Sequence, residues 1–381
     1  MAGIYIHVPF CTQRCVYCDF YFVTTATTYS PYVDALVNEI DHYGAKHISE
    51  EPIRTVYFGG GTPSLLKVAD VQRILLAIEN SFQLELEELT FEMNPEDGSH
   101  DYLSGLRDAG IDRLSIGVQS FYDRDLEFMN RSHNAEQAES VVETVRAAGF
   151  DNFSIDLIFG IPGQPPEYWA ANLEKAARLD VPHVSTYGLT IEPETPLFKM
   201  VRNGKVTAIS EEDHADQFRF TIGYMVDAGY EHYEISSFAK PGHRAVHNHA
   251  YWSHTNYLGF GPSAHSFWWR GLPARRWVNV KNLRQYEGLL SGRTTPVEME
   301  EHLDLDTLAN EHIMLRLRTE DGLDMNFLES QYGLDLYEER VDDLAWLESE
   351  GFIEPIRNNR VKLTLDGKIM ADMVTSKLMI G

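Results

Sequence analysis

Hydrophobic residues recur in two alternating patterns along the first half of the chain. Short runs rich in β-branched residues predict six strands, at residues 4–8, 55–58, 89–93, 113–117, 153–158 and 184–189. Apolar residues at helical spacing between these runs predict helices at residues 32–43, 68–81, 102–109, 135–148 and 168–179. Strands that alternate with helices form right-handed units around a parallel sheet. Since a closed barrel of such units has eight, the pattern predicts an α/β fold with an open, partial barrel of about six units.

A different pattern begins after residue 205. A helix is expected at residues 211–228, and a segment rich in aromatic and basic residues follows at 240–293. From residue 296 the chain is acidic, and it predicts helices at 304–317 and 336–350, a hairpin of 352–356 with 361–365, and a last helix from 366. We therefore divide the chain into a partial barrel at residues 1–295, which includes the 240–293 segment, and a small C-terminal α+β domain of the helix-plus-wing type at 296–381.

Composition and charge narrow the class of protein. Of the 381 residues, 43% are hydrophobic and 24% are charged, as in folded globular proteins, so a disordered or fibrous chain is excluded. The net charge of −26 disfavours nucleic acid and anionic lipid as partners. No apolar run approaches the roughly 18 residues of a membrane span, and the N-terminus lacks the pattern of a secretory signal. We expect a cytoplasmic protein with no integral membrane segment.

The cysteines carry the first chemical signal. Cys11, Cys15 and Cys18 are the only three in the chain, and an odd, clustered set indicates a metal site rather than a disulfide framework. The C-x3-C-x2-C spacing favours a cubane iron–sulfur cluster whose fourth iron has no protein ligand and stays open to a small molecule. The alternative is a zinc site completed by His7, which is disfavoured because the chain has no second C-x2-C pair.

Polar and glycine residues follow the predicted strands, at the ends where parallel sheets bind their ligands. In strand order they are the cysteine loop, the glycine turn at 59–63, Glu92 with Asn94, Gln119, and Asp156 with the turn at 160–163. Each one alone is also explained by a turn or a helix cap. Their recurrence at successive strand ends predicts one common ligand site.

Residues 5–10 (Tyr-Ile-His-Val-Pro-Phe), the cysteine motif and the glycine turn together resemble the radical S-adenosylmethionine superfamily. Within it they resemble the branch of oxygen-independent coproporphyrinogen III oxidases and related haem chaperones. The resemblance implies a [4Fe-4S] cluster whose open iron chelates S-adenosylmethionine, which is then cleaved to a 5′-deoxyadenosyl radical. By motif match it also implies a cofactor pocket lined by Tyr5, Gly60, Gly61, Thr62, Glu92, Gln119, Arg131, Asp156 and Gly188. Tyr17, among the cysteines, is expected to join them and shield the cluster from water.

Phe20 separates the two activities of this branch. The oxidases that the chain resembles carry a further cysteine two residues after the third, and this sequence has Phe20 there. The resemblance therefore favours a chaperone, which binds haem as cargo and passes it to an acceptor protein not identified by the sequence. The alternative is an oxidase that decarboxylates propionates to vinyls, so whether the chain is an enzyme stays open.

The 240–293 segment has eight basic residues, a single acid, nine aromatic residues and five histidines. A porphyrin with two propionates needs stacking surfaces, cations and an imidazole, so the segment predicts contact with haem. Single-stranded nucleic acid suits an acidic chain less well, and the structural alternative is an aromatic core with hydrogen-bonded histidines. His247 is the expected haem ligand, with His249, His254 and His265 as rivals. Tyr251 and Trp252 complete an H-N-x-x-Y-W motif that resembles the chaperones.

Overall fold

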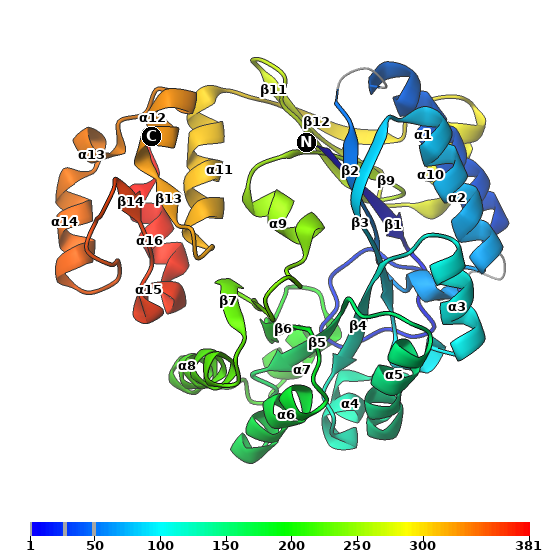
Figure 1. The fold of residues 1–381 in the computed structure, drawn as a ribbon, viewed down its shortest axis with the longest axis horizontal. Helices are drawn as coiled ribbons and strands as arrows, with labels where there is room; N and C mark the ends of the chain where they lie inside the picture. The colour runs from blue at the N-terminus through cyan, green and yellow to red at the C-terminus, as the bar shows by residue number, and fades with distance from the viewer. Residues whose placement is uncertain (1, 26–28, 48–50) are drawn as a thin grey trace.

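The structure is a computed structural model that describes residues 2–25, 29–47 and 51–381. Six parallel strands form its centre in sequence order (Figure 1). They are β1 (Ala2–Val8), β2 (Ile53–Gly60), β3 (Leu84–Met93), β4 (Arg113–Gln119), β5 (Phe153–Phe159) and β6 (His183–Gly188). In the described ranges β1 does not pair with β6, so the partial, open barrel predicted from the sequence is confirmed.

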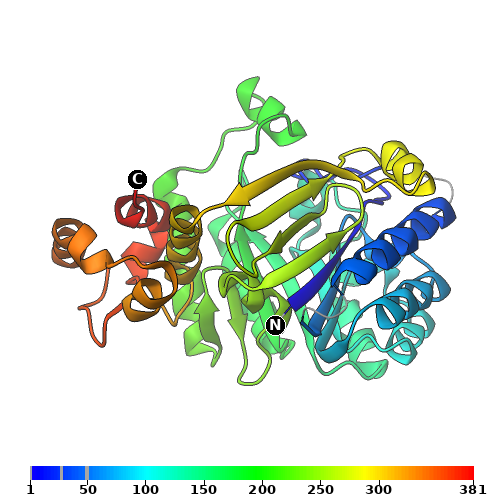
Figure 2. The ribbon, with the colours of Figure 1, turned by 90° about the horizontal axis from the view of Figure 1, so that it is seen from above.

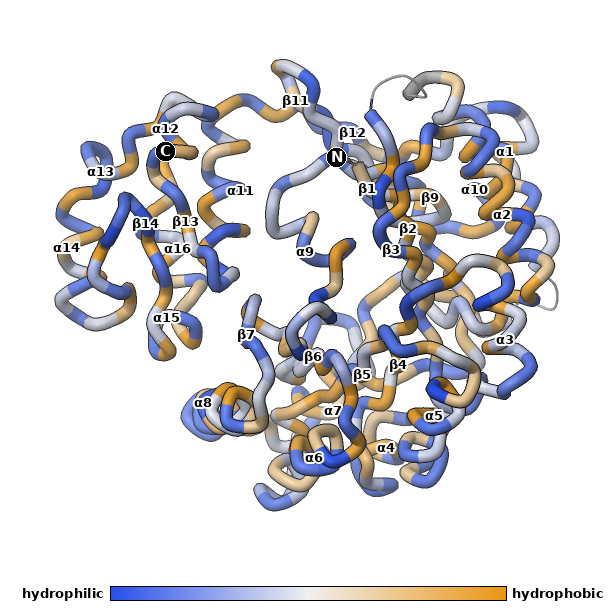
Figure 3. Tube along the Cα trace, viewed as in Figure 1, coloured by the Kyte–Doolittle hydropathy of each residue, from blue (hydrophilic) through white to orange (hydrophobic). Residues whose placement is uncertain are grey.

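Helices follow these strands, and most of them cover the outside of the sheet. They are α1 (Ser30–His47), α2 (Val68–Ser81), α3 (His100–Asp108), α4 (Asp123–Met129), α5 (Ala135–Ala147), α6 (Pro166–Arg178), α7 (Pro196–Arg202) and α8 (Glu211–Asp227), with short 3-10 turns η1 (Pro63–Leu65) and η2 (Pro95–Asp97). Hydrophobic and hydrophilic residues alternate along these helices (Figure 3), as expected where one face packs on a sheet. The longer helices were predicted within a few residues, whereas α4 and α7 were missed because two helical turns carry little periodicity.

The sheet is wider than the sequence predicted. Beyond β1 it continues through parallel β9 (Asn256–Phe260) and antiparallel β10 (His265–Trp268), β11 (Ala274–Asn279) and β12 (Val297–Leu303). Beyond β6 it continues through antiparallel β8 (Ser237–Ala239) and β7 (Glu231–Glu234). β12 lies past residue 295, so the sheet extends beyond the boundary drawn from the sequence. Glutamates on this exposed edge strand discourage pairing with another chain.

The 240–293 segment contributes to this extension. It forms β9, β10 and β11 together with α9 (Val246–Trp252) and α10 (Leu283–Ser291). Several of its aromatic residues are core residues. Trp277 stacks on Tyr43 of α1 with ring centroids 5.8 Å apart and planes 6° apart, and Phe260 is also buried.

The C-terminal part forms a helical lobe beside the sheet (Figure 2). It contains α11 (Leu305–Leu317), β13 (Leu323–Asp324), α12 (Met325–Tyr332), α13 (Leu336–Glu339), α14 (Val341–Ser349), β14 (Arg360–Val361), α15 (Leu365–Ile369) and α16 (Ala371–Leu378). The single helix predicted at 336–350 is wrong, since Arg340 has a non-helical φ of −133° and separates α13 from α14. The hairpin is confirmed: Ile353 bridges Leu363, and Asn358 and Asn359 turn the chain at φ of 54° and 55°.

None of the described helices combines the length and the apolar character needed to cross a membrane.

A buried carboxyl group joins α1 to the extended part of the sheet. Glu39 accepts hydrogen bonds from the Tyr286 hydroxyl at 2.6 Å, from the Gly261 backbone N–H at 2.9 Å and from the Asn279 amide at 2.6 Å. Burial raises the pKa of Glu39 to about 7 despite these three donors. The folded protein therefore holds this proton more tightly than the unfolded chain does.

Glu39→Gln tests this assignment through the pH dependence of stability. Because its folded pKa is raised, Glu39 contributes stability below the unfolded pKa and loses it as pH rises toward 7. The free energy of unfolding of the wild type, relative to Glu39→Gln, should fall by about 2 kcal/mol between pH 5 and pH 8. Urea unfolding at both pH values measures this change, with Glu298→Gln on the exposed edge as the control. An unchanged difference would show that Glu39 keeps an ordinary pKa.

Candidate functional site

A cavity of about 600 Å³ lies at the carboxyl ends of the parallel strands. Cys11, Cys15 and Cys18 border it from the loop after β1. The predicted cofactor residues that border it with them are Tyr17, Gly60, Gly61, Thr62, Glu92, Gln119, Arg131, Asp156 and Gly188. The tenth, Tyr5, lies behind this layer, where its ring stacks on Tyr57 with centroids 6.1 Å apart. The strand-end positions therefore do meet in one place.

Backbone hydrogen bonds hold the cysteine loop to the segment around Val23 and to α4. The N–H of Cys11 donates to the Val23 carbonyl at 3.1 Å, and the N–H of Val16 donates to the Met129 carbonyl at 3.1 Å. All three thiols are half-buried and free of disulfides. Burial raises the pKa of Cys11, and it raises the pKa of Cys18 to about 11. Cys11 and Cys18 therefore present neutral thiols, which release their protons when they bind metal.

The geometry suits a cluster better than a zinc ion. His7, the histidine considered for zinc, has its Nε2 2.9 Å from the Tyr21 carbonyl oxygen and its Nδ1 3.3 Å from the Tyr5 hydroxyl. Among the described residues no three His, Cys, Asp or Glu side chains are arranged around a single metal ion. Three thiols spread along a cavity wall fit a cubane, in which each thiolate binds a different iron.

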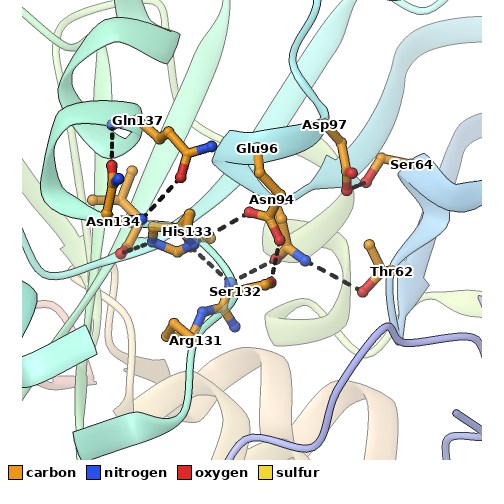
Figure 4. A network of polar contacts seen from close by, with 12 residues as sticks. Thr62, Ser64, Asn94, Glu96, Asp97, Arg131, Ser132, His133, Asn134 and Gln137 are labelled. Carbon is orange, nitrogen blue, oxygen red and sulfur yellow. Dashed lines mark hydrogen bonds and ion pairs between the residues drawn. The ribbon is translucent and has the colours of Figure 1, made fainter. Parts of the chain in front are cut away.

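A chain of polar contacts links two of the thiols through the ends of β2 and β3, and Figure 4 shows the contact between Asn94 and Thr62 in this chain. Arg131 donates to the Cys15 sulfur at 3.4 Å and to the Asn94 side-chain oxygen at 2.5 Å. Asn94 donates to the Thr62 hydroxyl at 3.4 Å, and Thr62 donates to the Cys11 sulfur at 3.7 Å. The buried Nε of Arg131 has no partner among the described groups. This unused charged donor suits the carboxylate of a ligand.

The residues after Arg131 fix its position (Figure 4). The Ser132 hydroxyl donates to Glu96. His133 is buried, with its Nε2 3.0 Å from the Val118 carbonyl oxygen and its Nδ1 3.3 Å from Glu96. Arg131 is therefore held in the wall of the cavity and is not part of an ion pair on the surface.

Two carboxyl groups border the same cavity. The oxygens of Glu92 accept from the Tyr57 hydroxyl at 2.7 Å and from the Gly60 N–H at 3.2 Å. Burial raises the pKa of Glu92 to about 7 and that of Asp156 to about 6. Near neutral pH these groups exchange a proton readily, and their ionised forms attract a cationic ligand group.

The glycine turn brings backbone atoms close to the cavity. A Cβ on Gly60, whose φ is 103°, would lie 2.4 Å from Nδ1 of His7, and a Cβ on Gly61 would lie 2.6 Å from the Phe10 carbonyl oxygen. Only glycine therefore fits at either position.

The predicted haem ligand His247 lies in α9, which occupies the space between the barrel strands and the C-terminal lobe (Figure 1). Its Nδ1 is 2.8 Å from the Thr55 hydroxyl, and its Nε2 is 3.0 Å from the Tyr251 hydroxyl. The ring stacks on Tyr57 with centroids 5.0 Å apart. Burial lowers the pKa of His247 to about 3, so it is neutral. Trp252, at the end of the same helix, is half-buried.

The rival histidines have different surroundings. His254 stacks on Phe267 at 4.6 Å, and its Nε2 is 3.2 Å from a Glu311 oxygen. His249 is half-buried and His265 is exposed. Several cations of the segment are paired with acids from other parts of the chain, namely Lys240 with Asp180, Arg244 with Glu231 and Arg276 with Glu311.

Known proteins match nearly the whole length of this chain. The radical SAM superfamily matches residues 5–176, and the HemN C-terminal domain matches residues 303–369. The haem chaperone HemW of Bacillus subtilis is 33% identical over 98% of this chain and 98% of its own. The chain belongs to the HemW family of radical SAM proteins. The HemW of Lactococcus lactis is 34% identical over 89% of this chain and 88% of its own. These matches confirm the resemblance seen in the sequence.

A solved structure shows the same fold for nearly the whole HemW-family chain. Coproporphyrinogen III oxidase HemN from Escherichia coli superposes with a TM-score of 0.84, covering 99% of this chain and 90% of that one at 24% identity. Membership of the radical SAM family implies a [4Fe-4S] cluster and S-adenosylmethionine. The three thiols, the unused Arg131 donor and the two carboxyl groups fit these groups.

The sequence missed several residues that border the cavity. Ser115 and Gly117 precede Gln119 by two-residue steps on β4, so strand alternation would have placed them on the same face. Tyr187 and Glu192 border it from the end of β6 and the following loop, where no periodic signal exists.

The raised pKa of Glu92 predicts how S-adenosylmethionine binding depends on pH. Its affinity for the anaerobically reconstituted protein should rise about tenfold between pH 5.5 and 7.5, because Glu92 ionises and attracts the cationic ligand. Isothermal titration calorimetry measures this change. Glu92→Gln should flatten the profile, whereas Glu192→Gln, at the same cavity, should keep it. A profile that persists in Glu92→Gln would assign the effect to another group.

Proposed function

We propose that this protein is a haem chaperone, which binds haem and passes it to an acceptor protein. The observation that carries the proposal is the match to the Bacillus subtilis haem chaperone over 98% of both chains. A match of this length covers the barrel, α9 and the C-terminal lobe together.

We further propose that Cys11, Cys15 and Cys18 hold the cluster and that S-adenosylmethionine binds beside it. The open iron supplies a coordination site and a single electron. Arg131 binds the ligand carboxylate through its free Nε, while Glu92 and Asp156 bind the ammonium group or ribose hydroxyls. S-adenosylmethionine would bind the haem-delivering conformation of the protein more tightly than the alternative conformation. Its binding would therefore stabilise the haem-delivering conformation.

Phe20 supports transfer over decarboxylation. Its side chain borders the cavity, and 65% of it is exposed. The oxidases that the sequence resembles have a thiol at this position, and a phenyl ring can neither donate a proton nor bind iron. A porphyrinogen bound at this site would therefore find no thiol at position 20.

His247, Tyr251 and Trp252 stay predicted haem contacts on the strength of their motif. In the described conformation both ring nitrogens of His247 are hydrogen-bonded, to Thr55 and Tyr251. Ligation of iron by His247 therefore requires one of these two bonds to break, while the other nitrogen can keep its partner.

The test uses the whole protein, reconstituted anaerobically with iron and sulfide. We expect four irons and four sulfides per chain, a Soret shift on haem titration, and transfer of haem to apomyoglobin. The triple variant Cys11→Ala, Cys15→Ala, Cys18→Ala should lose the cluster but still bind haem. It should transfer haem more slowly than the wild type. Thr12→Ala, in the same loop, is the control. Protoporphyrinogen formed from coproporphyrinogen III with reductant and S-adenosylmethionine would overturn the proposal in favour of an oxidase.

Arg131→Met tests the assigned cofactor carboxylate contact. Loss of one charge-assisted hydrogen bond should weaken S-adenosylmethionine binding about tenfold or more, with the iron content unchanged. Calorimetry and iron analysis on the reconstituted protein separate these effects. Arg124→Met, whose guanidinium binds the exposed Gly163 carbonyl, is the control. Wild-type affinity in Arg131→Met would place the carboxylate elsewhere.

A further inference from the structure

Thr62 and Asn94 stand at positions where their side chains would ordinarily cap a helical turn. Thr62 immediately precedes the 3-10 turn η1, and Asn94 immediately precedes η2. Both residue types are preferred before a helical turn, because the side-chain oxygen accepts a hydrogen bond from a free backbone N–H. The residues of both turns are all described, and neither side chain makes this capping bond. The two side chains are therefore directed at other groups.

Those groups include the thiols of Cys11 and Cys15. Thr62 is buried, and its hydroxyl oxygen lies 3.7 Å from the Cys11 sulfur. Nη1 of Arg131 lies 3.4 Å from the Cys15 sulfur. Asn94 contacts both of these donors: its side-chain oxygen is 2.5 Å from Nη2 of Arg131, and its side-chain nitrogen is 3.4 Å from the Thr62 hydroxyl (Figure 4). A single amide thus joins two side chains that each reach a cysteine sulfur.

The chemistry of the guanidinium group fixes the direction of the hydrogen bonds in this chain. Arg131 can only donate, so Asn94 must present its oxygen to Arg131 and its nitrogen to Thr62. Because the Thr62 oxygen then accepts from Asn94, its one proton is available for the Cys11 sulfur. A thiolate bound to iron has no proton and can only accept. The direction of these bonds therefore suits cysteines that hold a metal cluster.

Hydrogen bonds to the sulfurs are one of the factors that set the reduction potential of an iron–sulfur cluster. Reduction adds one electron, and therefore one negative charge, to the iron atoms and their thiolates. A donor to a thiolate stabilises the reduced form more than the oxidised form, and a charged donor such as Arg131 has the stronger effect. Both donors therefore raise the potential, and loss of either one makes the cluster harder to reduce.

We propose that Asn94 is a positioning residue, which orients the donors Arg131 and Thr62 toward two cysteine sulfurs and so raises the reduction potential of the cluster. This inference rests on the cluster of the proposed function and names residues that tune it. It gives Arg131 two tasks on separate nitrogens, since Nη1 faces Cys15 and the free Nε is assigned to S-adenosylmethionine.

A redox titration of the anaerobically reconstituted full chain, without S-adenosylmethionine, tests this role. Dithionite supplies the electrons, and electron paramagnetic resonance of the reduced cluster gives the signal. Asn94→Leu, which has a similar shape but no polar side-chain atom, should shift the reduction equilibrium about tenfold toward the oxidised form, or about 59 mV for one electron. Its iron content should not change, because Arg131 keeps the Gly117 carbonyl as an acceptor at 3.0 Å.

Variants of Thr62 test one of the two donors alone. Thr62→Val loses only the neutral donor and should shift the equilibrium about threefold in the same direction. Thr62→Ser keeps the hydroxyl and should keep the wild-type potential. The matched control is Thr12→Val in the cysteine loop, where the threonine is exposed, and it should also keep the potential.

A double variant distinguishes positioning from a general disturbance of the site. Asn94→Leu should shift the equilibrium less in the Thr62→Val background than in the wild type, because one of the two oriented donors is already absent. Equal shifts in the two backgrounds would overturn Asn94 as the residue that orients Thr62.

The outcomes separate this inference from the proposed function. If the reconstituted wild type holds no four-iron cluster, the proposed cluster fails. If the wild type and Asn94→Leu hold equal iron and sulfide at the same potential, the positioning role is overturned and the proposed function stands. If Asn94→Leu does not hold a cluster, the Thr62 variants still decide: one potential shared by Thr62→Val, Thr62→Ser and Thr12→Val would overturn the inference.

Discussion

The rest of the structure depends on one constraint: the six strands from β1 to β6 all pair in parallel, each with the next. Because all six strands run in one direction, their carboxyl ends lie at the same edge of the sheet, and each following loop begins there. The register sets neighbours across this edge, with Val8 opposite Gly60 and Glu92 opposite Ser115. Three thiols, a glycine turn and two carboxyl groups, far apart in sequence, therefore border one cavity. The cofactor site would not exist without this common edge.

The cavity holds groups of both charge signs. Arg131 lies next to Cys15 with a free Nε, while Glu92 and Asp156 line the strand ends with pKa values raised toward neutrality. A cation and titratable acids around one cavity suit the carboxylate and ammonium groups of an amino-acid moiety. Because their pKa values are raised, Glu92 and Asp156 hold protons near neutral pH when the cavity is empty, and they ionise when a cationic group binds. The site thus avoids a permanent pair of buried negative charges.

The segment at 240–293 has a structural role in the fold, in addition to any role in binding a ligand. Glu88 of β3 accepts from the backbone N–H groups of Val246 and His247 at 2.8 and 3.0 Å, which fixes the start of α9 inside the molecule. Glu39 fixes the strands that follow to α1. Many of the aromatic residues that looked like a porphyrin surface are thus core residues.

The sequence by itself determined the alternation of strands and helices, the cysteine loop, and the strand-end positions of Glu92, Gln119 and Asp156, because these depend on local periodicity and spacing. It also identified the family, since the residues of each motif lie close together along the chain. Only the tertiary structure decided that β9 pairs with β1 and that α9 lies inside the molecule. Such contacts join residues whose separation along the chain leaves no periodic trace, and they follow from how the lobe packs on the sheet. Local patterns therefore place residues on elements, and packing alone chooses which elements meet.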